Sequence, residues 1–421
     1  MKKIIISNGF TNFPLRFVAE GLHKKGYDVV LLTGVYPFKK LITLFKILHI
    51  DKFEPIQRII NRKISIPDKK IQSFFISEIF YQIGRNLYNH FDGLKKIYKY
   101  IDFNAAKLYQ ISSNKFLKNL PLNQKYIYLC RAGYGGNSLI RNKNFKVFVE
   151  HQNVHPKIFF SAVQKKGRIT KNIRFKDRLD GLFIHIKHDL DLSKNLIILG
   201  EQSLYTNKLY FQKNLKKNKK LFFKGVARLS ENYIKYLKKK KFFKKFIKNE
   251  RLKVFYLGSF VERKGADVLL NIMKNYNEKK IDLTIITNGF DFKYKKKIEK
   301  LRRKNIIFLI NKKVDYIIET MIKNHVCIFP SYSEGLARTC MEALACGNYL
   351  VTSKIFTDFK NKNLGVSFVD QTNSKGWLKE LYKLRKKPKI LNKAFVNNHT
   401  QAIKIFNQEM FIKKYSNYFK I

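Results

Sequence analysis

The segment from Asn324 to Ser353 constrains the fold of this chain more than any other stretch. Its apolar run Val326–Phe329 predicts a short buried strand, and a proline with three polar residues ends that strand in a turn. Apolar and small residues then recur from Leu336 to Cys346, with Gly347 placed for a left-handed C-cap. A second apolar strand, Tyr349–Val351, follows at once. This order predicts one unit of a parallel α/β sheet, whose turn lies where such sheets bind ligands.

The turn and the start of the helix carry residues that suit a charged or hydroxylated ligand. Ser333 or Glu334 is a candidate N-cap, and the amides after it would lack partners within the helix. These amides belong to Gly335, Leu336 and Ala337. With the positive end of the helix dipole they would form an anion site. Glu334 and Glu342 lie about two helical turns apart, and carboxylates accept hydrogen bonds from sugar or ribose hydroxyls.

The stretch from Pro330 to Ser353, PSYSEGLARTCMEALACGNYLVTS, resembles the E-x7-E signature of the retaining family 4 glycosyltransferases. The matching residues are Glu334, Gly335, Glu342, Ala343, Leu344, Ala345 and Gly347. The resemblance implies a GT-B fold, an α/β architecture in which two Rossmann-like domains face each other across a cleft. It also implies that the C-terminal domain binds a nucleotide-diphosphate sugar as co-substrate, without a metal or another cofactor. The alternative is an ordinary β-α-β unit with two exposed glutamates.

A second stretch, KVFYLGSFVERKG from Lys253 to Gly265, resembles the family pattern Gly-Arg-x4-Lys-Gly. In the family, the arginine and the lysine bind the pyrophosphate of the donor. Gly258, Lys264 and Gly265 match this pattern, but Ser259 stands where the family has its arginine. Because the departing pyrophosphate gains charge in the transition state, a missing cation there would cost several kcal/mol of stabilisation, on the order of one lost electrostatic contact.

The resemblance assigns roles to individual donor-side residues. Lys264 would stabilise the departing β-phosphate, and Arg263 is a candidate to supply the missing charge because its guanidinium suits phosphate. Glu342 would accept the ribose hydroxyls, and Glu334 would orient the sugar. The nucleotide base would meet backbone groups near Val314, so the sequence does not identify the base.

In the N-terminal half, two glycine turns and two histidines fall at the ends of expected strands. Gly9 follows the strand Ile4–Ser7, and Gly133 lies in the turn RAGYGG after another strand; both turns would border the cleft. His151 and His155 follow a strand that ends at residue 150. In the family a histidine at this place faces the donor sugar, and the sequence does not choose between the two.

The expected domain order follows from these segments. Residues 1–227 form an acceptor-side Rossmann-like domain with a basic helical insert at about 38–120, and 228–250 form a linker. Residues 251–400 form the nucleotide-sugar domain. Residues 401–421 form a C-terminal helix that crosses back to the N-terminal domain.

The net charge of the chain indicates what kind of partner it binds. The formal net charge of +56 comes from 86 Lys and Arg against 30 Asp and Glu. A drift in base composition explains part of the lysine excess but not the scarcity of acids, so we expect an anionic membrane surface as a partner. The pattern of Phe38–Ile50 predicts a basic amphipathic helix. We expect this segment itself to cap the N-terminal core. We expect the first domain as a whole to contact a membrane. Nucleic acid is not favoured, because no recognisable nucleic-acid module occurs.

The cysteines and the apolar runs indicate where the protein resides. Cys130, Cys327, Cys340 and Cys346 lack metal-site spacing and fit buried thiols, so no metal is expected. The sequence has no run of about 18 consecutive apolar residues, so we expect no membrane-spanning helix. We expect a cytoplasmic protein, peripheral on the inner face of the plasma membrane, that acts as a metal-independent, hexosyl-type glycosyltransferase in lipopolysaccharide, capsule or other surface glycan synthesis. Two alternatives stay open: a GT-B nucleotide-sugar epimerase, and a non-catalytic polyanion-binding homologue.

Overall fold

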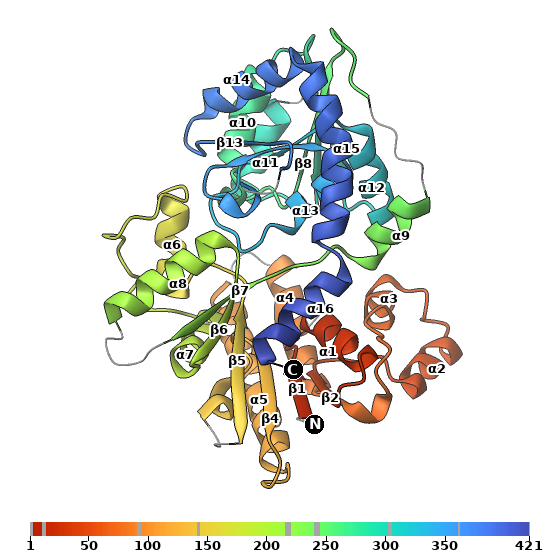
Figure 1. Ribbon diagram of the computed structural model, residues 1–421, viewed down its shortest axis with the longest axis vertical. Coiled ribbons are helices and arrows are strands. Elements are labelled where there is room, and N and C mark those ends of the chain that lie inside the picture. The colour runs from red at the N-terminus through yellow and green to blue at the C-terminus, as the bar shows by residue number, and fades with distance from the viewer. Residues whose placement is uncertain are drawn as a thin grey trace.

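The computed structural model describes residues 3–10, 14–90, 95–140, 144–214, 220–239, 245–301, 305–360 and 363–420. These residues form two α/β domains, each built on its own parallel sheet, that lie one above the other in Figure 1. All the strand pairs between named strands in the described residues are parallel. The expected arrangement of two Rossmann-like domains is confirmed.

The first sheet has seven strands in the order β3-β2-β1-β4-β5-β6-β7. Its strands are β1 (Lys3–Ser7), β2 (Val29–Thr33), β3 (Ile71–Ser73), β4 (Tyr126–Arg131), β5 (Phe145–His151), β6 (Asn195–Leu199) and β7 (Leu221–Gly225). The central strands are apolar on both faces because helices cover both sides of a parallel sheet. In β1 and β2, for example, Ile4, Ile5, Val29 and Leu32 are all buried.

The helices of the first domain include the expected basic insert. The elements are α1 (Leu15–Lys24), α2 (Lys39–Ile47), α3 (Glu54–Ile60), η1 (Asp68–Lys70), α4 (Phe75–His90), α5 (Lys95–Lys118), η3 (Gly136–Ile140), α6 (Pro156–Gln164), α7 (Leu182–Leu192) and α8 (Glu201–Asn214). The insert adds α2 to α5 and also the short edge strand β3, which pairs with β2. One expectation fails here. Helix α2 does not cap the core, because none of its residues is buried.

The second sheet has six strands in the order β10-β9-β8-β11-β12-β13. Its strands are β8 (Leu252–Leu257), β9 (Ile281–Thr287), β10 (Ile306–Ile310), β11 (Val326–Phe329), β12 (Tyr349–Ser353) and β13 (Val366–Val369). Its helices are η4 (Glu262–Lys264), α10 (Ala266–Asn275), α11 (Phe292–Lys300), α12 (Val314–Lys323), α13 (Arg338–Ala345), η5 (Thr357–Phe359), α14 (Ser374–Arg385) and α15 (Pro388–Ile405). The strand–turn–helix–strand unit expected at residues 326–351 is β11-α13-β12, with β11 paired directly to β12.

Two segments connect the domains. The first leaves β7 and enters α9 (Glu231–Lys239), whose Tyr233 and Leu237 are buried in the core of the second domain. The second is α16 (Gln408–Phe419), which returns from the second domain and lies beside α1 in Figure 1. Its Phe411 and Tyr415 belong to the core of the first domain. The expected crossing of the C-terminal helix is therefore confirmed.

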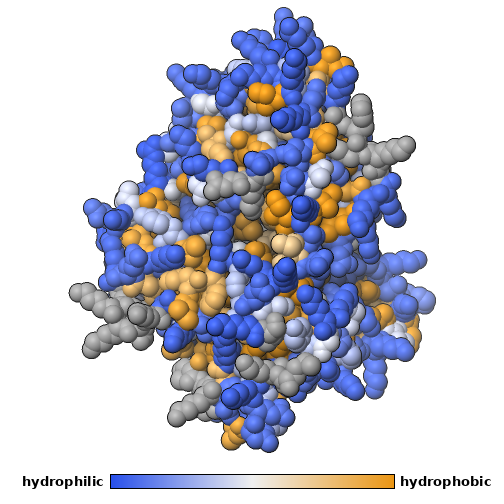
Figure 2. Space-filling model, in the orientation of Figure 1, coloured by the Kyte–Doolittle hydropathy of each residue, from blue (hydrophilic) through white to orange (hydrophobic). Residues whose placement is uncertain are grey.

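The surface seen in Figure 2 is mostly hydrophilic, in keeping with the lysine content. The side chains of all four cysteines are buried. Among the helices that the structure describes, none combines the length and the apolar character that crossing a bilayer requires.

Candidate functional site

The loop between β11 and α13 holds the candidate donor site and differs from its expected form. Helix α13 begins at Arg338 with Ala337 as N-cap, so the expectation of Ser333 or Glu334 as N-cap is wrong. The later start of the helix is explained by a contact between this loop and the first domain. A Cβ atom on Gly335 would lie 1.7 Å from the carbonyl oxygen of Gln152, so this loop is pressed against the first domain. Only glycine allows that approach.

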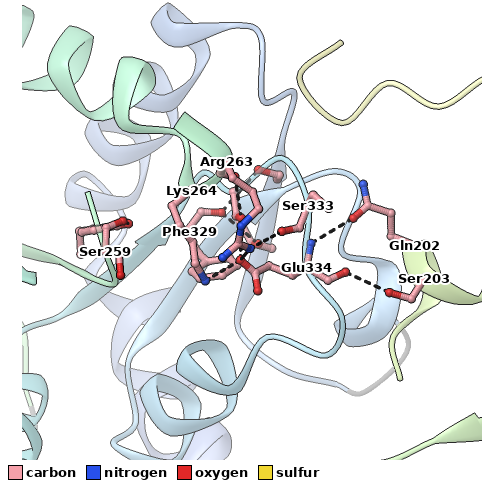
Figure 3. Close-up of polar contacts among 12 residues, drawn as sticks. Gln202, Ser203, Ser259, Arg263, Lys264, Phe329, Ser333 and Glu334 are labelled. Atoms are coloured by element: carbon pink, nitrogen blue, oxygen red, sulfur yellow. Dashed lines mark hydrogen bonds and ion pairs between the residues drawn. The ribbon is translucent and has the colours of Figure 1, made fainter. Parts of the chain in front are cut away.

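Glu334 is the centre of a charged cluster in this loop. Its Oε1 accepts a hydrogen bond from Arg263 at 2.5 Å and pairs with Lys264 Nζ at 2.5 Å. The hydroxyl of Ser331 donates to the same oxygen at 3.1 Å. Figure 3 shows both cations converging on the carboxylate. Burial raises the pKa of Glu334, but Lys264 and Arg263 outweigh it and hold the pKa below its usual value. The cluster thus contains two cations for one carboxylate, which leaves positive charge available to an anion.

The turn from η4 into α10 carries both cations to this place. Gly265 ends η4 with φ 77°, and a Cβ atom there would lie 2.2 Å from the carbonyl oxygen of Pro330. The turn therefore packs directly on the end of β11. Two further hydrogen bonds fix it, because the carbonyl of Arg263 accepts from the Tyr332 amide at 2.8 Å and from the Ser331 hydroxyl at 3.0 Å.

Ser259, which stands where the family arginine was expected, lies outside this cluster. Its side chain is exposed, and Figure 3 shows it apart from Arg263 and Lys264. Its carbonyl accepts a hydrogen bond from the Tyr256 hydroxyl at 2.8 Å, and the amide of Gly258 donates to Ile286. The second cation of the site is instead Arg263, which also donates to the carbonyl of Ser333 at 2.7 Å.

Glu342 has a different environment from Glu334. It is buried in α13, where Arg338 Nε lies 3.4 Å from its Oε1 and Tyr233 of α9 acts on its carboxyl. Burial raises the pKa of Glu342 to about 7, although Arg338 and Tyr233 both act to lower it. Tyr233 belongs to α9, and sequence reasoning gave it no role because nothing in its local pattern points to a site 109 residues away.

Both candidate histidines are buried in the first domain. Nδ1 of His155 accepts from the Lys157 amide at 3.3 Å and so caps α6, while its ring stacks on Tyr210 with centroids 3.7 Å apart. Nε2 of His151 lies 3.4 Å from the carbonyl oxygen of Val154. Burial lowers the pKa of His151 to about 4 and that of His155 well below its usual value, so both rings are neutral at pH 7.

The first domain reaches the Glu334 loop through two residues that sequence reasoning left without a role. Gln202 donates to the carbonyl of Tyr332 at 3.0 Å and accepts from the amide of Glu334 at 3.2 Å. The hydroxyl of Ser203 donates to the carbonyl of Glu334 at 3.3 Å. Both stand in the first turn of α8, directly after β6, and Figure 3 shows them facing the loop. Their place after a strand of a parallel sheet was the available signal.

The remaining predicted positions lie away from the Glu334 cluster. Gly9 donates its amide to the Tyr109 hydroxyl at 3.2 Å. The amide of Gly133 donates to the buried carboxylate of Asp189 at 2.7 Å, so this turn binds a side chain of its own domain. Val314 is the first residue of α12, and 44% of its surface is exposed.

Comparison with known proteins concerns above all the second domain. Residues 237–401 match the glycosyl transferases group 1 family. This range contains Arg263, Lys264 and the whole Glu334 loop. An uncharacterized glycosyltransferase of Methanocaldococcus jannaschii is 32% identical over 104 residues, which are 24% of this chain and 28% of the relative. The alignment thus spans little more than a quarter of that relative's length.

Solved structures extend the likeness to the whole fold. Sucrose-phosphate synthase from Thermosynechococcus elongatus superposes with a TM-score of 0.59 at 14% identity, covering 100% of this chain and 98% of the other. HepE from Anabaena, in complex with UDP and glucose, gives 0.56 at 10% identity over 100% of both chains. A TarM mutant from S. aureus, in complex with UDP and two further ligands, gives 0.59 at 13% identity over 100% of both chains. The fold of this chain is therefore GT-B.

Proposed function

We propose that this protein is a retaining glycosyltransferase of the family 4 type, which moves a hexose-type sugar from a nucleotide diphosphate to an acceptor hydroxyl. The observation that carries the proposal is the convergence of Arg263 and Lys264 on Glu334, in a loop beside the start of α13. Two cations beside one carboxylate retain positive charge after the ion pairs form. That surplus suits a diphosphate, which is the group that leaves when the sugar is transferred.

Catalysis on this proposal depends on stabilising the leaving group. The β-phosphate gains charge as the sugar bond breaks, and Lys264 and Arg263 stabilise it together with the amides of residues 335–337 and the dipole of α13. Arg263 takes the part of the arginine that Ser259 replaces. A phosphate oxygen of the leaving group accepts the proton of the attacking hydroxyl, so no protein base and no metal are required for retention.

The other donor contacts come from both domains. Glu342 accepts the ribose hydroxyls, for which its buried carboxyl with a pKa of about 7 is a suitable acceptor once it ionises. His151 or His155 contacts the sugar from the first domain, as the family pattern implies; both lie on the segment that also presents Gln152 to Gly335. UDP is our first choice of nucleotide, because the similar HepE and TarM structures contain it.

The acceptor on this proposal is a glycan or lipid-linked acceptor at an anionic membrane surface. Helix α2 exposes Leu44 and Ile47, and Leu48, Ile50 and Phe53 beyond it are also exposed. Lys39, Lys40 and Lys46 are exposed beside them. Figure 2 shows hydrophobic residues among hydrophilic ones on this lobe, which lies at the right of the first domain. Apolar side chains flanked by lysines match an element that lies in a membrane interface.

The experiment is release of nucleotide diphosphate by the purified protein from a panel of donors, beginning with UDP-sugars, with and without a membrane lipid extract. Lys264→Ala and Glu342→Ala are compared with Lys279→Ala, which removes an exposed lysine of the same domain. Release that requires the extract, Lys264 and Glu342 would support the transferase. No release from any donor, with polyanions still bound tightly, would favour the polyanion-binding alternative. Change of the donor sugar without acceptor would favour the epimerase.

A further inference from the structure

Three arginines from distant segments meet at one place in the first domain. Arg16 lies in the first turn of α1, Arg62 follows α3, and Arg228 lies in the segment that joins β7 to α9. The guanidinium carbons of Arg16 and Arg228 lie 4.5 and 3.7 Å from the centroid of the same Phe17 ring. Burial, together with the nearby charges of Arg62 and Arg228, lowers the pKa of Arg16 to about 10.

Arg62 and Arg228 have partners. Arg62 pairs with Glu78 at 2.8 Å and donates to the carbonyl of Val35 at 3.1 Å. Arg228 donates to the carbonyl of Leu229 at 3.3 Å and lies 4.0 Å from Glu231, a half-exposed carboxylate. These contacts neutralise Arg62 well and Arg228 only weakly.

Arg16 is different. Only 7% of its surface is exposed, and its Nε and Nη1 are buried with no hydrogen-bond partner among the described residues. The nearest carboxylate acting on it is Glu20, which already accepts from Ser65 at 2.7 Å and pairs with Lys24 at 3.2 Å. Two buried guanidinium nitrogens without hydrogen bonds destabilise the fold, so the packing of Arg16 on Phe17 does not by itself account for its burial.

The position of Arg16 suggests what it binds. Its backbone amide donates to Asn8 Oδ1 at 3.1 Å, and Asn8 directly follows β1, at the carboxyl edge of the first sheet. Ligands bind at this edge in open α/β sheets, and the start of α1 adds the positive end of a helix dipole. The cluster lies in the first domain, whereas Lys264 and Arg263 lie in the second. These two groups of cations, among the described residues, thus lie in different domains.

We propose that Arg16 and Arg228, supported by Arg62, bind a phosphate group of the acceptor substrate. The inference rests on the proposed function, because it takes the first domain as the acceptor side. A phosphate offers several oxygens at once, which matches two guanidinium groups of fixed fork geometry better than a single carboxylate does. Arg228 stands on the segment that joins the two domains, so a phosphate bound between Arg16 and Arg228 would also contact this connection.

The test measures binding of inorganic phosphate to the full-length protein, by the shift in Tm and by ³¹P line broadening. Arg16→Gln is compared with Lys264→Ala, which affects the donor site, and with Arg174→Gln, whose exposed guanidinium serves as the matched control. We expect Arg16→Gln to weaken phosphate binding about 10- to 100-fold, as loss of hydrogen bonds to a charged group does. Lys264→Ala, with Arg16 intact, keeps this binding, and so does Arg174→Gln. Phosphate binding unchanged in Arg16→Gln, or lost only in Lys264→Ala, overturns the proposal.

Stability without phosphate gives a second readout. Because two guanidinium nitrogens of Arg16 are buried without hydrogen bonds, Arg16→Gln keeps or raises the Tm of the ligand-free protein, whereas removing a cation that serves only the fold would lower it. A lower Tm together with an unchanged phosphate shift contradicts the proposal. Neither readout needs sugar transfer. If no donor is turned over but Arg16-dependent phosphate binding persists, the proposed function fails while the anion site stands. If transfer occurs and phosphate ignores Arg16, only the anion site fails.

Discussion

The clusters around Glu334 and Arg16 are both groups of charges at the edges of their sheets, the first half-buried and the second centred on the buried Arg16, and their charges are compensated to different extents. Glu334 has two cations and a hydroxyl within hydrogen-bond distance, which hold its pKa below the usual value. Arg16 has two buried guanidinium nitrogens without partners in the described structure. A paired cluster is formed before its ligand arrives, whereas an unpaired buried charge is completed by the ligand. On the two proposals above, the second domain would present a prepared donor site and the first domain an acceptor site that its ligand completes.

We expect the largest effect when a cation is removed from the Glu334 cluster. Lys264→Ala should lower kcat/KM for donor turnover about 100- to 1,000-fold, because a group that stabilises transition-state charge is lost. Ser259→Arg should restore little activity in that background, since Ser259 lies apart from the cluster. The measurement is the rate of nucleotide diphosphate release, with Lys279→Ala as the control. A loss below about threefold would mean that the two cations do not act on the leaving group.

The next prediction concerns how Glu342 and Glu334 change the free energy of unfolding with pH. The folded pKa of Glu342 is about 7, above the ordinary value of 4.5, so the folded state binds more protons than the unfolded state between these values. Stability from this group is therefore lost as the pH rises from 4.5 through 7. Relative to Glu342→Gln, the wild type should lose roughly 3 kcal/mol across that range, as an order of magnitude.

Chemical denaturation at a series of pH values measures this difference. Glu334→Gln is the matched variant, and the opposite sign is expected there because the pKa of Glu334 is lowered, so its contribution is lost as the pH falls. If the free energy of unfolding changed with pH in the same way in Glu342→Gln and Glu334→Gln, the proposed difference between the two carboxyl groups would be contradicted.

A smaller effect concerns the backbone that supports the paired cluster. Gly265→Ala should destabilise the fold by more than about 1 kcal/mol, because alanine is strained at φ 77° and its Cβ would meet the carbonyl of Pro330 at 2.2 Å. Gly289→Ala is the matched control, since a Cβ there meets nothing within 4 Å. The comparison uses urea denaturation midpoints. Equal midpoints for the two variants would show that the turn does not need glycine.

The smallest expected effect is at the contact between the domains. Ser203→Ala removes one hydrogen bond to the carbonyl of Glu334, which contributes about 1 kcal/mol, so KM for the donor should rise roughly fivefold with little change in kcat. Steady-state kinetics with the best donor measure this split. Tyr205→Phe, at an exposed position of the same helix, is the control. A change confined to kcat would place Ser203 in the chemical step instead of donor binding.

The sequence alone predicted central strands of both sheets, because their apolar runs are local signals, whereas the short edge strands β3 and β13 were not expected. The strand expected at 326–329 has these bounds in the structure. The start of α13 was misplaced, because the contact of Gly335 with Gln152, far away in the sequence, draws residues 335–337 out of the helix. Helix α2 was expected on the core because amphipathic spacing does not tell which surface an apolar stripe faces.

The sequence by itself determined the parallel α/β units and the spacing of Lys264, Gly265, Glu334 and Glu342, since these depend on apolar runs, glycine positions and short spacings, and its resemblance to the family 4 glycosyltransferases implied the GT-B fold. Only the tertiary structure decided that Arg263 joins Lys264 on Glu334, that Tyr233 meets Glu342, and that Arg16, Arg62 and Arg228 gather around Phe17. The physical reason is that pairing, burial and pKa depend on neighbours brought together by the packing of two domains. No local pattern in the chain encodes those neighbours.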